Sequence, residues 1–337
     1  MALTHIVVDL MGSDSSHKLL YEGALKASEL LADTCKITVV ATQKVLDECF
    51  KDRKPLAAVI ATQEVLMDES PLLAVRRKKK SSMAIGIKML KKKECDAFVS
   101  AGNTGAITAY SSLELPKLPG ISRPALLTEL PTNKGRSSVL DVGANISFRP
   151  ESFFQFALMG AAYQQVKRGT TCPKIGLLNI GAEVRKGTRK IRQAYDYFVD
   201  KKEQMLQANL SFEGNVESQD FFSGKVDVLV TDGFTGNVFL KTCEGVSSFI
   251  LDQMRDRFSQ KNNSSEKEGF KELEKYLDYA EYPGAVLVGI EGVVVKCHGS
   301  SSTTAMVSGI KGAFSLVKEQ VIPQIKTHLE GFQQKFK

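Results

Sequence analysis

Two turns of this sequence place a charged residue beside glycine, directly after a short apolar run. Lys186 lies in the turn of LLNIGAEVRKGT (177–188), and Asp232 lies in the turn of VLVTDGFTGNV (228–238). A lysine on such a turn can neutralise phosphate or stabilise a developing oxyanion, although a loop lysine is more often simply solvated. A carboxylate at the end of a strand either caps the next helix or positions a nucleophile. The sequence leaves both alternatives open for each residue.

Three more glycine-bearing turns follow apolar runs, in VVDLMGSD (7–14), FVSAGNTGA (98–106) and VVVKCHGSSS (293–302). Asn103, Thr104 and Gly105 stand at a predicted helix start, where backbone and side-chain donors suit a phosphate or an oxyanion. An ordinary helix cap is the alternative. His298 ends a predicted strand, where an imidazole could act as an acid or a phosphate donor. Several such turns on one chain predict an enzyme that binds and converts a phosphorylated ligand.

Several common site patterns are absent from the sequence. The order Lys186–Gly187 is the reverse of the glycine-lysine order in a phosphate-binding P-loop, and no GxGxxG occurs. There is no G-x-S-x-G elbow, and Cys297 and His298 would point to opposite sides of an extended strand. The sequence therefore has no local signature of an acyl-enzyme, and any acyl chemistry is expected to proceed by direct attack.

The composition is that of a soluble globular protein that can bury a large core. The 337 residues include 43% hydrophobic and 25% charged residues, and six cysteines show no metal-ligand spacing with the four histidines. No secretory leader or apolar run of about 18 residues is present, so we expect a cytoplasmic protein without a metal. The basic runs 76–80 and 91–93 flank one predicted helix and contribute to a net charge of +7. They favour acidic partners such as phosphate, an acidic carrier protein, anionic lipid or nucleic acid, and a solvated helix face is the alternative.

Short β-branched runs alternate with amphipathic stretches along the chain, which predicts a three-layer α/β/α sandwich with a mainly parallel sheet. We expect one unit over residues 1–337, with two lobes hinged near 115–150, where five prolines interrupt any helix. Residues 244–258 and 270–279 predict a helical hairpin (244–280) that projects from the sheet. Strands are predicted at 6–9, 37–41, 58–61, 97–100, 139–141, 175–180, 226–231 and 293–297.

Ten fragments in collinear order resemble the bacterial phosphate acyltransferase (PlsX) family. They are VDLMGSD, RRKKKSSM, VSAGNTGA, RPAL, LDVGAN, RPESFFQFA, GLLNIGAEVRKG, GNVES, TDGFTGNVFLKTCEG and VVVKCHGSSS, and they span residues 8–302. The resemblance implies a fold similar to phosphotransacetylases and isopropylmalate dehydrogenases. It also implies conversion of long-chain acyl-[acyl carrier protein] and inorganic phosphate to acyl phosphate and free carrier, with no metal or nucleotide cofactor.

By the same resemblance, Lys186 and Asp232 are the expected catalytic pair. Implied partners are the acidic acyl carrier protein, inorganic phosphate, a second subunit in a homodimer, a transient membrane surface and a downstream glycerol-3-phosphate acyltransferase, without nucleic acid. The protein is then expected to be cytoplasmic and peripherally membrane-associated. The residues expected to bind phosphate or substrate are Asn103, Thr104, Gly105, Asn145, Gly233, Asn237, His298, Gly299, Ser300 and Ser301.

Three other functions are alternatives to a phosphate acyltransferase. A short-chain phosphotransacetylase acting on acyl-CoA shares the expected fold and chemistry. An assay that compares turnover of long-chain acyl carrier protein with turnover of acetyl-CoA separates the two. A binding module would recruit lipid or an acidic protein through the basic helix and the apolar hairpin, and it would release no thiol. An NAD-dependent dehydrogenase of the isopropylmalate type is disfavoured, because the sequence has no adenine-site glycine pattern and no tight aspartate cluster for magnesium.

Overall fold

The structure is a computed structural model that describes residues 3–51, 53–146, 149–259, 274, 277, 284–299 and 301–336. The strands are β1 (Thr4–Asp9), β2 (Cys35–Thr42), β3 (Ala57–Ala61), β4 (Ala97–Ser100), β5 (Ala125–Thr132), β6 (Gly135–Leu140), β7 (Lys174–Leu178), β8 (Ser211–Val216), β9 (Val228–Val230), β10 (Ala285–Val288) and β11 (Val293–Lys296). The helices are α1 (His17–Leu30), α2 (Gln43–Phe50), α3 (Pro71–Arg77), α4 (Ser82–Lys91), α5 (Thr104–Glu114), α6 (Glu151–Arg168), α7 (Arg189–Asp200), α8 (Lys202–Gln207), α9 (Ser218–Phe222), α10 (Gly233–Ser259), α12 (Thr303–Lys318) and α13 (Val321–Lys335).

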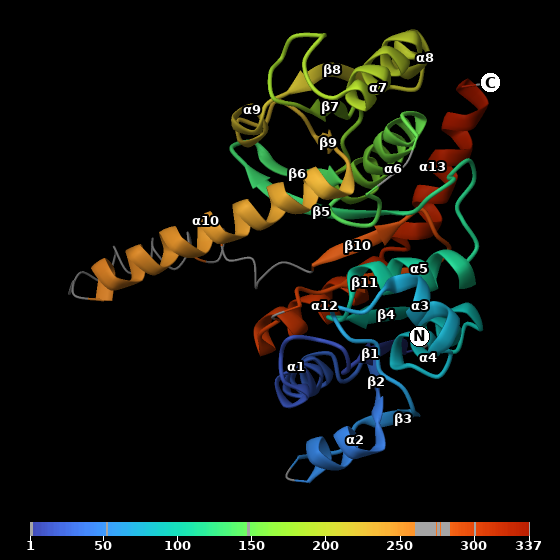
Figure 1. Cartoon of the computed structure of the whole chain (residues 1–337), viewed down its shortest axis with the longest axis vertical. Coiled ribbons are helices and arrows are strands. Elements are labelled where there is room, and N and C mark those ends of the chain that lie inside the picture. Colours follow the sequence, from blue (N-terminus) through green and yellow to red (C-terminus); the bar gives the residue numbers. More distant parts are fainter. Residues whose placement is uncertain are drawn as a thin grey trace.

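One sheet runs through the described part of the chain in the order β3-β2-β1-β4-β11-β10-β5-β6-β9-β7-β8 (Figure 1). The strands β3, β2, β1, β4 and β11 are mutually parallel, as are β6, β9, β7 and β8. Antiparallel pairings join β11 to β10, β10 to β5 and β5 to β6, all in the middle of the sheet. The predicted α/β fold with a mainly parallel sheet is confirmed.

Both faces of the sheet are covered by helices, because successive strand residues point to opposite sides. In β1, Ile6 and Val8 pack into one apolar cluster and Val7 into the other, all fully buried. The first cluster lies under α1, α2, α6, α7, α8, α12 and α13, and the second lies under α3, α4, α5, α9 and α10. The continuous apolar runs of the strands are therefore explained by burial on both sides.

The proline-rich region near 115–150 contributes two central strands, of which β5 is absent from the sequence predictions. Pro131 lies within β5, opposite Arg136 of β6. The other neighbour, β10, pairs only with Ala125–Leu127, so Pro131 stands beyond that ladder. A residue without an N–H is tolerated where one edge of a strand is unpaired.

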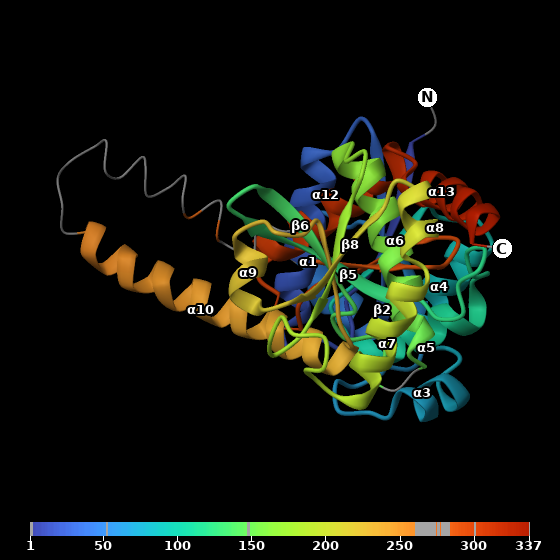
Figure 2. The ribbon, with the colours of Figure 1, turned by 90° about the horizontal axis from the view of Figure 1, so that it is seen from above.

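Helix α10 is a single element of 27 residues that begins directly after Asp232, where the sequence predicts a helix start at Gly233 to Asn237. The helix predicted separately at 244–258 is the continuation of the same element. Gly236 suggests a turn but is helical. A Cβ there would collide with the carbonyl oxygen of Asp141, so close packing requires glycine at this position. The helix projects far from the body of the molecule (Figures 1 and 2). Most of the second predicted hairpin helix, 270–279, lies outside the described residues.

Within the ranges that the structure describes, no helix combines the length and apolar character that a bilayer span needs.

Candidate active site

Polar residues follow the carboxyl ends of three neighbouring parallel strands, β1, β4 and β11, at one edge of the sheet. Asp14 comes shortly after β1, Thr104 follows β4, and His298 follows β11. The carboxyl ends of parallel strands meet at one edge, which is where α/β enzymes bind ligands. The Asp14 amide donates to the Gly299 carbonyl at 3.1 Å, which ties the first and last turns together.

A cavity of about 310 Å³ lies at this edge, between the strand ends and α10. We call it the polar cavity. Its polar lining includes Asp14, Thr104, Lys241, Glu244, Lys296 and His298.

Lys296 is the most deeply buried cation of the polar cavity, with 8% of its surface exposed. Its ammonium donates to the carbonyls of Ala101, at 3.3 Å, and Cys297. Burial lowers the pKa of Lys296 from 10.5 to about 8. The group is therefore mainly charged at neutral pH and loses that charge only in mildly alkaline solution.

Lys241, Glu244 and His298 form a close group at the α10 side of the cavity. His298 Nε2 lies 3.5 Å from Lys241 Nζ and 3.6 Å from Glu244 Oε2. Burial, followed by the charges of Lys241 and Lys296, lowers the pKa of His298. Burial raises the pKa of Glu244. The cavity thus combines two ammonium groups, a neutral imidazole at pH 7 and carboxylates that can accept hydrogen bonds.

Cys297 also lines the polar cavity. The residue is 2% exposed, and burial raises its pKa to about 11. A thiolate, not a thiol, is the nucleophilic form of cysteine. At neutral pH this side chain is therefore protonated and poorly suited to forming an acyl-enzyme.

Lys186 lies on a turn that is braced by two buried asparagines. Asn179 Nδ2 donates to the Lys186 carbonyl at 3.1 Å, and Asn215 Nδ2 donates to the Glu183 carbonyl at 2.9 Å. The Lys186 side chain is 49% exposed, with its ammonium 3.8 Å from a Glu183 carboxylate oxygen. Gly187 has φ +84°, and a Cβ there would press against Asn179. The backbone is fixed while the lysine head group remains accessible.

Asp232 accepts three hydrogen bonds at the start of α10. Oδ1 accepts from the amides of Phe234, at 3.0 Å, and Thr235, at 2.9 Å, and Oδ2 accepts from the Thr235 hydroxyl at 2.7 Å. This is the geometry of a helix N-cap. It also holds the carboxylate in one orientation, as a positioned catalytic group requires.

A second, larger cavity of about 860 Å³ opens between these two turns. We call it the apolar cavity. Gly187 and Thr188 line it from the Lys186 turn, and Thr235 lines it beside Asp232. The aliphatic and aromatic residues of its wall include Leu178, Ile180, Ile191, Phe222, Val238 and Phe239.

The same helix, α10, forms a wall of both cavities. Thr235, Val238, Phe239, Thr242 and Val246 face the apolar cavity, at helical spacing along one side. The residues that face the polar cavity, at intervening positions, are Asn237, Leu240, Lys241 and Glu244.

Four of the predicted binding residues, Thr104, Asn237, His298 and Gly299, line the polar cavity together. Asn103 instead has a structural position. Its Oδ1 caps α5, accepting from the Ala106 amide at 2.9 Å, and its Nδ2 donates to the carbonyls of Leu66, Met67 and Glu69.

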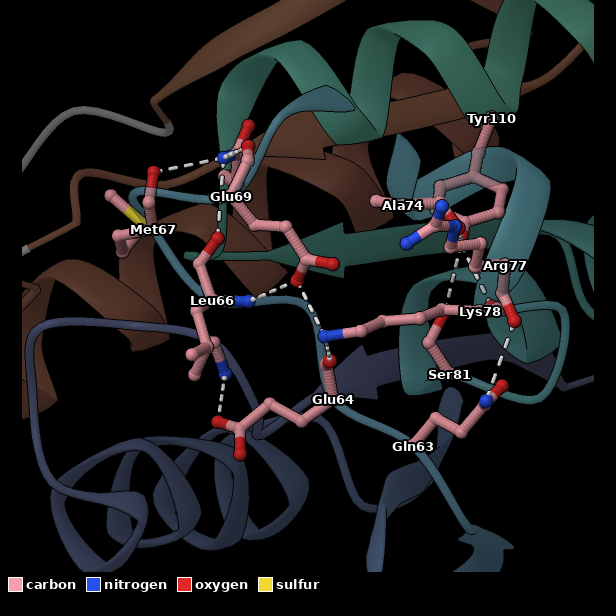
Figure 3. Close-up of polar contacts among 12 residues, drawn as sticks. Gln63, Glu64, Leu66, Met67, Glu69, Ala74, Arg77, Lys78, Ser81 and Tyr110 are labelled. Carbon is pink, nitrogen blue, oxygen red and sulfur yellow. Dashed lines mark hydrogen bonds and ion pairs between the residues drawn. The ribbon is translucent and has the colours of Figure 1, made fainter. Parts of the chain in front are cut away.

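Figure 3 shows the loop that Asn103 holds, with the Lys78 ammonium donating to the Glu64 carbonyl at 2.6 Å and to the Glu69 carboxylate at 2.5 Å. Met67 of this loop lines the polar cavity. One lysine of the basic run 76–80 is therefore committed to the internal structure of the loop.

The remaining predicted residues pack the turns around the cavities. Asn145 Nδ2 donates to Asp141 and to the Pro124 carbonyl, and the Gly233 amide donates to the Asn145 carbonyl at 2.9 Å. Gly105 lies against Pro71, and the Ser301 hydroxyl donates to the carbonyl of His298. Ser300 lies outside the described residues.

Sequence reasoning missed Lys241, Glu244 and Lys296. The first two follow Asn237 by four and seven residues, so they share its helix face once α10 begins at Gly233. Predicting separate helices at 233–237 and 244–258 concealed this relationship. Lys296 ends an apolar strand, and only the tertiary structure shows that its ammonium is buried.

The chain matches a family model described as "Fatty acid synthesis protein" over residues 4–324. It is 40% identical over 329 residues to a phosphate acyltransferase of Chlamydia caviae, covering 96% of this chain and 98% of that protein. It is 41% identical over 331 residues to a phosphate acyltransferase of Thermoanaerobacterium thermosaccharolyticum, covering 96% of each.

Two solved structures are similar in fold. A phosphotransacetylase from Streptococcus pyogenes has a TM-score of 0.56 at 15% identity, covering 97% of this chain and 94% of its own. A branched-chain phosphotransacylase from Enterococcus faecalis V583 has a TM-score of 0.57 at 15% identity, covering 93% of this chain and 99% of its own. The chain therefore belongs to the fatty acid synthesis protein family, with phosphate acyltransferases among its relatives, and is itself an acyltransferase.

Proposed function

We propose that this acyltransferase converts long-chain acyl-[acyl carrier protein] and inorganic phosphate to acyl phosphate and free carrier, in the supply of acyl groups to glycerol 3-phosphate. The observation that carries the proposal is the pair of cavities on either side of α10. One is polar and contains two lysines and two acidic residues, and the other is mainly apolar. Such a pair suits a reaction between an anion and a lipid-like thioester. Homodimer formation and transient contact with membrane stay predictions from the family resemblance.

Phosphate would bind in the polar cavity between the ammonium groups of Lys241 and Lys296. Charge-assisted hydrogen bonds to phosphate are among the strongest that a protein makes. The nearby carboxylates of Asp14 and Glu244 can accept a hydrogen bond from the phosphate hydroxyl. These contacts would hold an oxygen of phosphate in position for attack and reduce the entropy cost of a two-substrate step.

The chemistry would be a direct displacement. A phosphate oxygen forms a bond to the thioester carbonyl carbon, a tetrahedral oxyanion forms, and the C–S bond then breaks. The proton of hydrogen phosphate passes to the departing pantetheine thiolate, so acyl phosphate and free thiol are the products. The protonated state of Cys297 supports this course over an acyl-enzyme.

Lys186 and Asp232 are proposed to act on the thioester at the mouth of the apolar cavity. The accessible ammonium of Lys186 would stabilise the oxyanion, in the manner of an oxyanion-hole donor. Asp232 directly precedes α10, whose Thr235 lines the apolar cavity and whose Asn237 lines the polar cavity. From this position its carboxylate, fixed by three hydrogen bonds, would orient the attacking phosphate or accept its proton.

The decisive experiment mixes purified protein with inorganic phosphate and palmitoyl-[acyl carrier protein] and measures products by mass spectrometry. Acyl phosphate and free carrier thiol are expected, both dependent on phosphate. A Cys297→Ala variant should keep turnover within a few-fold of the wild-type rate. Acyl phosphate missing from every donor would overturn the proposal, and an acylated side chain that turns over with phosphate would overturn direct attack.

The alternative, a short-chain phosphotransacetylase acting on acyl-CoA, is separated by comparing palmitoyl carrier with acetyl-CoA. The volume of the apolar cavity, about 860 Å³, favours the long-chain donor, because a two-carbon acyl group would leave most of that apolar surface uncovered.

A further inference from the structure

The apolar cavity has an open wall of exposed hydrophobic side chains. Ile180 is 81% exposed, and Val238 and Val246 are each 51% exposed. An exposed apolar surface that lines a concavity marks a binding site for a ligand or another protein. The cavity volume lies within the range of about 300–1,000 Å³ that is typical of small-molecule sites.

This cavity is mainly apolar along its α10 wall, through Val238, Phe239 and Val246, with Thr242 and Ser247 between them. One end of it is formed by the turns that carry Lys186 and Asp232, through Asn179, Thr188 and Thr235. A ligand with a polar reacting head and an apolar tail matches a mainly apolar cavity that ends at two charged turns. Contact with a second copy of the protein would not require the apolar cavity to end at the Lys186 and Asp232 turns.

We propose that the apolar cavity holds the acyl chain, with the thioester at the Lys186 and Asp232 turns and the methyl end near Val246 and Ser247. This inference rests on the proposed function and adds the site and the determinants of acyl-chain length.

The length of the α10 wall sets how many carbons of the acyl chain it contacts. Thr235 and Val246 are eleven residues apart, which is roughly 16 Å at 1.5 Å per helical residue. Carbon–carbon bonds of about 1.5 Å at near-tetrahedral angles advance an extended chain by about 1.3 Å per carbon. The wall therefore contacts roughly 12 to 13 carbons, the last few carbons of a palmitoyl group extend past Val246 beside Ser247, and Thr242, at seven residues, stands opposite about the eighth carbon.

A graded pair of substitutions tests the proposal. Thr242→Phe should restrict turnover to acyl groups of about eight carbons or fewer, and Ser247→Phe should remove only the longest donors. We expect kcat/KM for palmitoyl carrier to fall at least tenfold in both variants, while butyryl turnover stays within about threefold of wild type. The readout is acyl phosphate formed from donors of 4 to 16 carbons.

The matched control is Ser248→Phe, which places the same side chain one residue further along α10. Ser248 is exposed and lines neither cavity. The Ser248→Phe variant should therefore show the same dependence of turnover on acyl-chain length as the wild type. Sedimentation velocity of all variants measures subunit association. An unchanged length profile, or equal loss at every chain length, would overturn the proposal. A change in association with an unchanged profile would assign the cavity to a second copy.

Failure of this inference is distinguishable from failure of the proposed function. If wild-type protein forms acyl phosphate but the two cavity variants keep its length profile, only the location of the acyl chain is wrong. If no donor gives acyl phosphate, the proposed function itself fails.

Discussion

The hydroxyl of Thr235 donates a 2.7 Å hydrogen bond to Oδ2 of Asp232, from one turn inside the helix that Asp232 caps. The other carboxylate oxygen accepts from two amides of the same turn. Helix capping and carboxylate orientation therefore depend on the same contacts. The capping role can be separated from a chemical role, because residues that cap equally well differ in charge.

Asp232→Asn and Asp232→Ser should each keep the cap and lose the carboxylate. Asn, Asp and Ser are about equal as N-caps, so the free energy of unfolding should change by less than about 1 kcal/mol. Turnover should fall by roughly 100-fold or more if the carboxylate orients phosphate or accepts its proton. Steady-state kinetics and denaturant unfolding check the two expectations. Wild-type turnover in both variants would reduce Asp232 to a cap.

Lys186→Ala should lower kcat by on the order of 100-fold, the usual cost of removing one oxyanion donor. Its melting temperature should match wild type, because the side chain is half exposed and its contact with Glu183 is a surface ion pair. Lys190→Ala, an exposed lysine in the first turn of α7, is the matched control and should retain activity. Equal kinetics for the two variants would remove Lys186 from the mechanism.

Lys296 predicts an alkaline limit on phosphate use. With its pKa lowered to about 8, the ammonium is charged below that pH and neutral above it, so kcat/KM for phosphate should fall as pH rises through about 8. Lys296→Met should raise the KM for phosphate by about tenfold or more, the cost of one charged hydrogen bond, and should abolish the alkaline fall. The KM for the acyl donor should change little. A variant that keeps the alkaline limb would exclude Lys296 as its source.

The exposed basic residues Arg76 and Arg77 predict electrostatic steering of the acidic carrier. The double variant Arg76→Glu/Arg77→Glu should raise the KM for palmitoyl carrier and weaken its salt dependence, while leaving the KM for palmitoyl-CoA nearly unchanged. Lys36→Glu is the control, because Lys36, at the amino end of β2, is exposed like Arg76 and Arg77. Lys78 is unsuitable for this test, since its ammonium braces the Glu64–Glu69 loop. If the KM for palmitoyl carrier and its salt dependence are unchanged, the basic run 76–80 is only a solvated helix face.

Most of the sheet was predictable because its strands are short apolar runs between helical stretches, as in Ile6–Asp9 and Ala97–Ser100. Strand β5 was missed because Pro131 argues against a strand unless its local pairing is known. The start of α10 after Asp232 was predicted, but its continuity with the helix at 244–258 was not. The close backbone approach that requires glycine at Gly236 is shown by no sequence pattern.

The polar cavity was only partly predictable. Turn chemistry indicated Thr104 and His298, because each follows an apolar run at the same edge of the sheet. For Asn103 the sequence left a helix cap and a binding role open, and in the structure its Oδ1 caps α5 while its Nδ2 donates to the carbonyls of Leu66, Met67 and Glu69. The burial that perturbs Lys296 arises from packing among distant segments, so its position in the sequence carried no signal.

Because one continuous helix contributes side chains to both cavities, occupancy of one cannot be energetically independent of the other if the helix rotates or slides. Any such movement that improves the fit of the lipid tail would change the spacing of Lys241 from the opposite strands. Thermodynamic reciprocity then requires the anion to alter affinity for the thioester by the same factor. Such a movement of α10 would make the affinity for each substrate depend on whether the other is bound.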